Sequence, residues 1–329
     1  MIRSKHKRQN GIAAITALLV VALATLLAAN LAWQLTIDMR RTEAQFLRAQ
    51  SIQFAIGAEL MAAHFLREDF EDDQENEEFC DHPDEDWAQT LTLPFEAGTI
   101  QGKLTDLQTR FNLNSLLING EKNTETVEYF GRLLERLELD PSLGAKIIDW
   151  IDPDQTEEFG GAEDGTYTSF TPGYRAANTW MTTPTELLAI DGFVAQENEE
   201  ASLAYQTLRQ AVTALPSFSQ KINVNAAPDA VLLAIPKNGG AQDADELRQN
   251  YPYCQLLSGE QGDGAFLDLP GGIEVDPVFA NQYLDVSSSF FQLKVTVTLG
   301  TNQFTMYSLL YRDPTDGWVT TKLRYFDTE

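Results

Sequence analysis

The residues best suited to chemistry lie in one acidic stretch, directly after an apolar run that ends at Ile151. Oxygen-bearing side chains recur there at places one, three, five, seven and twelve of an EF-hand-like loop: Asp152, Asp154, Thr156, Glu158 and Glu163. Hard oxygen ligands that alternate along a loop and end in a glutamate suit Ca²⁺. The sixth place holds Glu157 where an EF-hand needs glycine, so the stretch predicts a calcium loop of another shape.

Four acidic residues of this stretch are the favoured calcium ligands: Asp152, Asp154, Glu163 and Asp164. Thr156 and Glu158 are weaker candidates for the same site. The bound ion would order the loop rather than carry out a reaction. The alternative is a solvated acidic turn that binds no metal. Most runs of acidic residues are exposed to solvent in this way.

Two cysteines, Cys80 and Cys254, lie far apart in the sequence and form no CxxC pair. In an oxidising compartment they could form one disulfide that closes a long loop, worth roughly 2–4 kcal/mol if unstrained. Two buried thiols are the alternative. Cys80 lies within an acidic run, residues 68–86, for which the composition predicts a solvated loop that is held at this one point.

No catalytic motif stands out from the sequence. Three histidines, His6, His64 and His82, lie in different surroundings, and the chain has no P-loop, GxSxG or HExxH pattern. Carboxylate pairs of the kind that glycosidases use are abundant but show no specific placement. We therefore predict a protein that is not an enzyme.

The charge of the chain limits its partners. The 329 residues carry a formal net charge of −26, and 43% of them are hydrophobic, which is enough for a long helix and one or two cores. An acidic surface repels nucleic acid and anionic lipid headgroups. We therefore expect no nucleic-acid partner.

The element that must position everything else is an uncharged apolar run near the N-terminus. Four basic residues end at Arg8, and the next charged residue is Asp38, so the run can cross a bilayer as one helix. The basic flank favours a cytoplasmic N-terminus. No proline precedes Pro83, and apolar residues continue at helical spacing, so we expect one helix over residues 12–66.

This N-terminus resembles that of the type IV pilins and pseudopilins. The resemblance rests on a basic leader, Gly11, and an apolar stretch that continues into a long amphipathic helix. It implies that prepilin peptidase cleaves between Gly11 and Ile12 and that Ile12 becomes the N-methylated end. Most members carry glutamate at the fifth mature position, where this chain has Thr16. That departure resembles the K-type minor pseudopilins of type II secretion (general secretion pathway protein K).

Three further segments strengthen the resemblance to the K-type family. They are the Asp-Trp-Ile-Asp-Pro-Asp run from Asp149, the GAEDGTY run from Gly161, and the TPGYRAAN run from Thr171. In that family the region belongs to an inserted helical domain whose loop is similar to one that holds calcium. The resemblance therefore implies calcium as the cofactor.

A repeated pattern suggests that the helical region has two similar halves. Asn112 with Asn114, and Asn223 with Asn225, alternate with apolar residues. We expect Asn114 and Asn225 to cap helices, and Asn112 and Asn223 to bond neighbouring backbone. The pattern resembles the paired SAM-like repeats of the K-type family. A DNA-binding helix-hairpin-helix is the alternative, and the acidic charge argues against it.

Alternating apolar and polar residues predict the remaining architecture. Strands are expected over residues 87–95, 99–107, 291–299, 304–311 and 318–326, and together they form one antiparallel sheet packed on the long helix. The fold class is α+β and pilin-like, with a large inserted all-α domain. The expected domains are a prepilin leader at 1–11, a transmembrane and assembly helix at 12–66, a pilin-like β domain at 67–110 and 277–329, and the insertion at 111–276.

The resemblance implies a structural role in assembly. The expected function is that of a minor pseudopilin at the tip of the type II secretion pseudopilus, which initiates or caps assembly to drive export of folded proteins across the outer membrane. The implied location is the bacterial inner membrane, single-pass, with a cytoplasmic N-terminus and a periplasmic bulk. Implied partners are the I-, J- and H-type minor pseudopilins, prepilin peptidase, the inner-membrane assembly platform, and secreted substrates or the outer-membrane secretin. The alternative is a membrane-anchored periplasmic calcium-dependent binding module.

Overall fold

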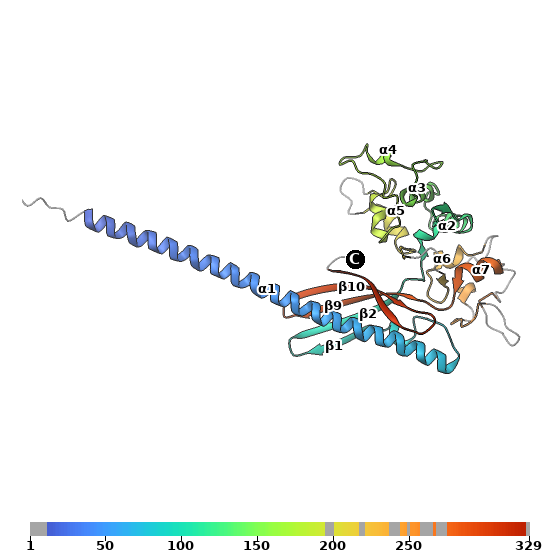
Figure 1. The fold of residues 1–329 in the computed structure, drawn as a ribbon, viewed down its shortest axis with the longest axis horizontal. Helices are drawn as coiled ribbons and strands as arrows, with labels where there is room; N and C mark the ends of the chain where they lie inside the picture. The colour runs from blue at the N-terminus through green and yellow to red at the C-terminus, as the bar shows by residue number, and fades with distance from the viewer. Residues whose placement is uncertain are drawn as a thin grey trace, which may run out of the picture.

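The computed structural model describes residues 12–194, 201–216, 221–236, 244–248, 251–256, 266–267 and 275–326. Gly11 and the rest of the leader lie outside the described residues. One long helix, a five-stranded sheet and a largely helical insertion make up the fold (Figure 1).

Helix α1 (Ile12–Asn76) is the longest element of the fold. Its apolar first half makes no contact with the rest of the protein, and its large side chains there are exposed, as in Leu26, which is 69% exposed. Among the described residues this is the one helix long and apolar enough to cross a membrane. Such exposure is costly in water and favourable in lipid, which is consistent with a membrane span.

The second half of α1 packs on the sheet through one stripe of residues. Ala55, Ala62, Leu66 and Phe70 are buried at steps of seven, four and four, which is the spacing of one helix face. Glu59 lies in the same stripe and is buried with them. Its carboxylate accepts hydrogen bonds from side chains of two strands, so burial does not leave it unpaired.

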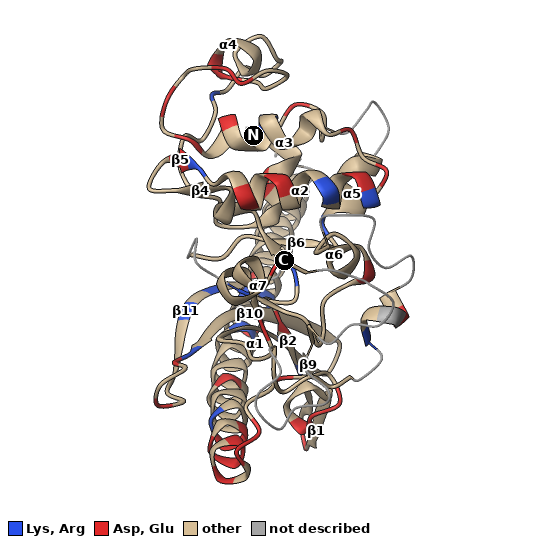
Figure 2. Cartoon of the chain, turned by 90° about the vertical axis from the view of Figure 1, so that its right-hand side faces the viewer, with Lys and Arg blue, Asp and Glu red and all other residues tan. Residues whose placement is uncertain are grey.

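The expected end of α1 at Leu66 is wrong, because the helix continues to Asn76. The acidic run that suggested a solvated loop is helical over its first half. Two contacts hold this extension against the sheet: Phe70 is buried, and Asp69 pairs with Arg312 at 2.8 Å. Figure 2 shows acidic residues gathered on these last turns of α1.

The sheet is antiparallel throughout and has the strand order β1-β2-β9-β10-β11. Its strands are β1 (Leu91–Phe95), β2 (Gly98–Asp106), β9 (Phe290–Leu299), β10 (Asn302–Arg312) and β11 (Val319–Phe326). The alternating pattern predicted these strands, although Trp87 lies in the short helix η1 (Asp86–Ala88) and not in β1. Because β2 pairs with β9, the strands before the insertion and the strands after it form one sheet.

The insertion contains short helices around its own core. Its elements are α2 (Thr124–Arg136), α3 (Ser142–Ile151), α4 (Asp164–Tyr167), η3 (Pro184–Ala189), α5 (Leu203–Leu208), α6 (Asp229–Leu233), η4 (Ala244–Arg248), α7 (Pro277–Tyr283) and η2 (Leu113–Leu116). Helix α7 packs into the same core, so the insertion extends past the expected boundary at 276. Two-residue strands also occur in it: β3 (Phe111–Asn112), β4 (Leu117–Ile118), β5 (Glu121–Lys122), β6 (Val212–Thr213), β7 (Ile222–Asn223) and β8 (Leu284–Asp285).

In each half of the insertion, the repeated asparagines lie where two short strands, distant in the sequence, pair in parallel. Strand β3 pairs in parallel with β6, and β7 pairs in parallel with β8. Asn112 Oδ1 accepts from Asn114 N at 3.2 Å, and Asn223 Oδ1 accepts from Asn225 N at 3.0 Å. The sequence correctly indicated two similar halves.

The expectation that Asn114 and Asn225 cap helices is wrong. Asn112 is the cap of η2, and no helix starts at Asn225. The amide of Asn114 bonds both backbone groups of Met181, and that of Asn225 bonds both backbone groups of Tyr253. Both side chains are buried, so they tie distant loops together instead of satisfying a helix end.

Cys80 and Cys254 form a disulfide, with their Cα atoms 4.8 Å apart. Cys80 follows α1, and Cys254 lies in the insertion, so the bond links the stalk region to the inserted domain. The linkage crosses 174 residues of sequence.

Candidate metal centre

Two helix ends bring the candidate ligands together. Helix α3 carries Asp149 in its last turn and stops at Ile151, where Asp152 takes an extended conformation as the C-terminal cap. Helix α4 begins at Asp164, with Glu163 extended at its N-terminal cap. The loop between the two helices therefore returns Glu163 to the end of α3.

Asp149, Asp152 and Glu163 each place a carboxylate oxygen within 4.8 Å of the other two. All three residues are buried, with exposures of 0%, 6% and 5%. Asp149 accepts backbone hydrogen bonds from Glu158 and Ala162, the latter at 2.8 Å, so the loop wraps around it. Only glycine fits at position 161, because a Cβ there would clash with the Asp149 carboxylate.

Three oxygens of this cluster lack the partners that burial requires. Oδ1 of Asp152 and both carboxylate oxygens of Glu163 are buried and accept no hydrogen bond. Burial, with the neighbouring Asp154 and Asp149, raises the pKa of Asp152 to about 6. Burial, with Asp149 and Asp152, raises the pKa of Glu163 to about 7. Buried carboxylates of like charge without a cation are unfavourable, and a divalent cation with oxygen preference fits them.

The structure brings only two of the favoured ligands into this cluster, Asp152 and Glu163. Asp154 is exposed and accepts from Thr156 N at 2.7 Å, and Asp164 accepts from Ala176 N at 3.0 Å. Of the weaker candidates, Glu158 pairs with Lys122 at 2.6 Å. The side chains of Asp154, Asp164, Thr156 and Glu158 are therefore not members of the buried trio.

The sequence pattern did not indicate Asp149, because the alternating carboxylates begin at Asp152, after the helix that carries Asp149. A signal was present: Asp149 precedes Asp152 by three residues, so at the end of a helix the two lie on the same side. The preceding apolar positions of α3, Ile147 and Ile148, direct this turn into the core and bury Asp149 with it.

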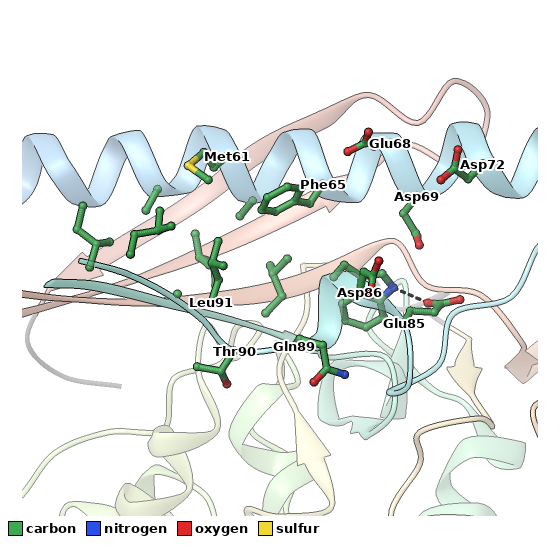
Figure 3. A pocket seen from close by; sticks show the side chains of 18 residues that line it. Met61, Phe65, Glu68, Asp69, Asp72, Glu85, Asp86, Gln89, Thr90 and Leu91 are labelled. Atoms are coloured by element: carbon green, nitrogen blue, oxygen red, sulfur yellow. Dashed lines mark hydrogen bonds between the residues drawn. The ribbon is translucent and has the colours of Figure 1, made fainter. Parts of the chain in front are cut away.

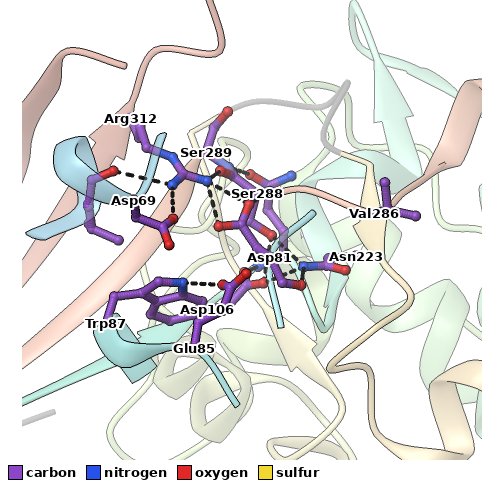
Figure 4. Close-up of polar contacts among 12 residues, drawn as sticks. Asp69, Asp81, Glu85, Trp87, Asp106, Asn223, Val286, Ser288, Ser289 and Arg312 are labelled. Atoms are coloured by element: carbon purple, nitrogen blue, oxygen red, sulfur yellow. Dashed lines mark hydrogen bonds and ion pairs between the residues drawn. The ribbon is translucent and has the colours of Figure 1, made fainter. Parts of the chain in front are cut away.

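A second acidic trio lies where α1, the sheet and the insertion meet. Oxygens of Asp69, Asp81 and Glu85 lie within 4.8 Å of one another, but this site already holds a cation. Both oxygens of Asp81 accept from Arg312 at 2.6 Å, and Asp69 accepts from the same guanidinium at 2.8 Å (Figure 4). The carboxylates here have partners, in contrast with those of the first trio, so they do not call for a metal.

The hydrogen bonds around Arg312 extend into the insertion. Asp106 at the end of β2 accepts from Ser288 Oγ at 2.6 Å and from Asn223 Nδ2 at 3.0 Å. Asn223 also donates to the carbonyl of Asp81. Asn223 Nδ2 donates as well to Ser288 Oγ at 3.1 Å, so this asparagine joins the insertion to both chain segments that enter the sheet (Figure 4).

The junction is the place around Arg312 where α1, the sheet and the insertion meet. It holds more carboxyl groups than basic groups, so the free energy of unfolding depends on pH. The charged and titratable groups around it are Asp69, Asp73, Asp81, Glu85, Asp106, His82 and Arg312. Burial first, and neighbouring carboxylates second, raise the pKa of Asp69 to about 7 and of Asp73 to about 8. Burial likewise raises the pKa values of Glu85 and Asp106 to about 7.

Raising the pH from 5 to 8 at fixed calcium is expected to destabilise the protein. In the unfolded chain these carboxyls lose their protons near pH 4, whereas in the folded protein they keep them until pH 7–8. The stabilisation is complete below pH 4 and is lost as the pH rises through the folded pKa values. For one fully buried carboxyl with a folded pKa of about 7, such as Asp106, the loss between pH 5 and pH 8 is about 2–3 kcal/mol. Denaturant titrations at each pH would measure it.

Asp73→Asn should flatten this pH dependence, because it removes the group with the highest of these pKa values. Glu75→Gln on the same helix is the matched control, since Glu75 is exposed. Greater stability at pH 8 than at pH 5 would contradict the assignment.

The fold is α+β and of the pilin-like class, with one helix that is long and apolar enough to cross a membrane. A long helix, apolar and bare in its first half, packs on an antiparallel sheet that carries a helical insertion. The crystal structure of the GspK-GspI-GspJ complex from the type 2 secretion system of enterotoxigenic Escherichia coli contains the same fold. Its similar chain superposes with a TM-score of 0.67 at 23% identity, over 88% of this chain and 100% of that one.

Sequence comparison identifies the family. Residues 109–217 match the family model for type II secretion system (T2SS), protein K. The type II secretion system protein K of Aeromonas hydrophila is 31% identical over 326 residues, covering 93% of this chain and 94% of that protein. That of Pseudomonas aeruginosa is 35% identical over 239 residues, covering 70% and 69%.

The chain belongs to the type II secretion system protein K family and is a minor pseudopilin of the K type. The expected family and α+β fold class are confirmed. Membership of this family does not favour the alternative of a membrane-anchored periplasmic calcium-dependent binding module.

Proposed function

We propose that the chain forms the tip of the pseudopilus, where it initiates or caps assembly and so drives export of folded proteins across the outer membrane. The position of the insertion carries this proposal: it lies beside the sheet at the end of the molecule away from the apolar half of α1 (Figure 1). A subunit with such bulk at its far end would obstruct the next subunit in a shaft.

Thr16 also supports a position at the tip of the pseudopilus. A shaft subunit uses a carboxylate at this place to receive the N-terminal amine of a neighbour, according to the family resemblance. Thr16 is neutral, and its hydroxyl donates to the carbonyl of Ala13 at 3.0 Å within the helix. A tip subunit has no subunit ahead of it and needs no such acceptor.

We place the first half of α1 in the inner membrane, with a cytoplasmic N-terminus and the sheet and insertion in the periplasm. The oxidising periplasm would maintain the disulfide between Cys80 and Cys254. The proposed partners are the I-, J- and H-type minor pseudopilins, prepilin peptidase, the inner-membrane platform, and secreted substrates or the secretin. The presence of I- and J-type proteins in the complex of the similar enterotoxigenic Escherichia coli chain supports the first of these.

We also propose that Asp149, Asp152 and Glu163 hold calcium. Their unpartnered buried oxygens fit a hard divalent ion. The ion would supply positive charge that orders the loop between α3 and α4 and would take part in no reaction. Backbone carbonyls and water would complete its coordination, since Ca²⁺ takes six to eight oxygens.

Processing at the leader tests the proposed function. In cells that contain prepilin peptidase, intact-mass measurement of the mature protein should give an N-terminus at Ile12 that carries one methyl group. Gly11→Leu should leave the leader attached, because the family resemblance implies that the peptidase cleaves just after this glycine. The same strain without the peptidase is the control. A mature protein that begins at Met1 in the presence of the peptidase would contradict assembly as a pseudopilin.

A further inference from the structure

The insertion and the body made of α1 and the sheet have separate hydrophobic cores. Among the described residues, a smaller apolar cluster lies where the two parts meet, formed by Leu107, Leu215 and Phe290 with Leu309 and Tyr311. This cluster contributes far less to docking than either core contributes to folding, because apolar stabilisation scales with buried area. How firmly the insertion is held on the body therefore depends on the polar contacts of the junction.

The polar contacts across this interface lie outside both cores, so they can open while each part stays folded. The backbone amide of Asp81 donates to the carbonyl of Val286 at 2.9 Å, and that of Asn223 donates to the carbonyl of Gln108 at 2.9 Å. Three covalent connections would keep the insertion attached after these bonds are lost: the passage from β2 to β3, the passage from β8 to β9, and the disulfide. Such an opening would move one folded part relative to the other.

Asp106 is a fully buried carboxyl of this interface, with an exposure of 5%. Its hydrogen-bond partners in the described part of the chain are neutral: Gln108 N at 2.8 Å, Ser288 Oγ at 2.6 Å and Asn223 Nδ2 at 3.0 Å. A buried carboxylate with neutral partners and a second aspartate nearby is unfavourable when ionised and much less so when protonated. Burial raises the pKa of Asp106 to about 7, so its charge changes near neutral pH.

The body side of the junction carries further carboxyls and a route to solvent. Asp69 points from the end of α1 toward the segment that holds Glu85 (Figure 3), and Asp73 follows one turn later on the helix. The basic groups that face them are Arg312, 2.8 Å from Asp69, and His82, 3.5 Å from Glu85. Asp69 and Glu85 also line a groove of about 560 Å³ between α1 and the hairpin of β1 and β2, through which water and protons can reach the junction.

On the insertion side of the junction the charges balance. Lys221 and Asp285, the charged residues next to Asn223, pair with each other at 3.4 Å. The five carboxyls of the junction, when all are ionised, therefore face one arginine and one histidine. This excess of negative charge is only partly hydrated while the interface is closed, and like charges in such surroundings repel strongly.

We propose that the junction is a pH-sensitive latch, which holds the insertion on the body at acidic pH and releases it on its three connections when the buried carboxyls lose their protons. Release lets water hydrate the carboxylates, which the closed interface does not allow. The pKa values of Asp69, Glu85 and Asp106 are higher in the closed state than in an open, hydrated one. Closure is therefore fully favoured below about pH 4 and is lost as the pH rises through 7. This movement goes beyond the proposed function and does not depend on a position at the tip.

Hydrogen exchange of the full-length protein in detergent micelles at pH 5 and pH 8 tests the latch. After correction for the intrinsic exchange rate, the amides of Asp81 and Asn223 should exchange about 100-fold faster at pH 8, the effect of one carboxyl with a closed-state pKa of about 7. At pH 8 they should also exchange much faster than the amides of Leu133 and Val295, which lie in the two cores. Their exchange should depend little on low urea concentrations, because opening exposes less surface than unfolding.

Substitutions of single carboxyls test which groups drive the opening. Asp106→Asn should reduce the response to pH, because a neutral amide gains no charge on going from pH 5 to pH 8. Glu85→Gln should reduce it as well, and it retains an acceptor for the indole of Trp87. Asp86→Asn is the matched control, since Asp86 is the exposed neighbour of Glu85, and it should respond as the wild type does. Melting temperatures at pH 5 close to that of the wild type would show that the variants are folded.

Two results would overturn the latch. If the junction amides and the core amides exchanged at pH 8 with the same free energy and the same dependence on urea, pH would act on global unfolding alone. The latch would also be wrong if Asp106→Asn and Glu85→Gln both kept the full response to pH.

Discussion

Arg312→Met is expected to lower the free energy of unfolding by about 3–5 kcal/mol, the cost of leaving a buried charge without its partner. The guanidinium is buried and bonds Asp81, Asp69 and the backbone carbonyls of Leu66 and Ser288. Asp81 is completely buried, with 0% exposure, so water cannot replace the lost partner. The same change also removes the link between the end of α1 and the last strands of the sheet.

Arg67→Met is the matched control for this variant. Arg67 lies on the same helix and pairs with Glu71 at 2.8 Å, but their side chains are 45% and 59% exposed. Exposed pairs contribute about 0–1 kcal/mol, even where the arginine also covers an aromatic ring, here Trp318. Urea unfolding of both variants at pH 8 would measure the difference.

The loss in Arg312→Met should become smaller as the pH falls from 8 to 5. Burial holds the pKa of Asp81 above its usual range and that of Asp69 at about 7, so both can be protonated in the folded protein. Protonation removes the unpaired charge that makes the substitution costly. Equal stability losses in the Arg312 and Arg67 variants would contradict the role assigned to the junction.

Removal of calcium is the second large effect that we expect. If the free calcium concentration is 100 times the dissociation constant, chelation should lower the free energy of unfolding by about 2.7 kcal/mol. The melting temperature should fall accordingly on addition of a chelator and recover on addition of excess Ca²⁺. No change in melting temperature would rule out a calcium ion that binds only the folded protein.

Glu163→Gln separates the calcium site from a solvated acidic turn. The variant should lose the response to calcium, because a neutral amide replaces one of the three buried carboxylates of the trio. Without calcium it should be more stable than the wild type, because it relieves repulsion with Asp149 and Asp152.

Asp164→Asn is the control for the calcium site. The carboxylate of Asp164 accepts from Ala176 N and lies 3.7 Å from Arg175, so the residue belongs to a different contact. It should retain the calcium response. If Asp164→Asn abolished the response and Glu163→Gln did not, the ligand set would be that of the loop sequence and not that of the buried trio.

The sequence by itself determined the elements whose signals are local. The uncharged run before Asp38 and the absence of proline predicted α1, and strict alternation from Phe291 predicted β9 to β11. The order of these elements was sufficient to predict an α+β fold with a helical insertion. The basic leader with Gly11, together with Thr16 and the acidic stretch after Trp150, indicated the family, since short motifs can be recognised without any tertiary contact.

The tertiary structure alone decided which polar residues act together. Arg312 meets Asp81 across 231 residues of sequence, and Asn223 meets Asp81 across 142. These residues bond one another because they are buried together. No local sequence pattern distinguishes an aspartate that will be buried from one that will face water. The same holds for the proposed calcium site. Asp149 belongs to the buried carboxylate trio because α3 packs its last turn into the core, whereas Asp154 and Asp164 accept other hydrogen bonds. Burial and distance are properties of packing, and for that reason composition and spacing predicted the acidic loop but not which of its carboxylates are buried together.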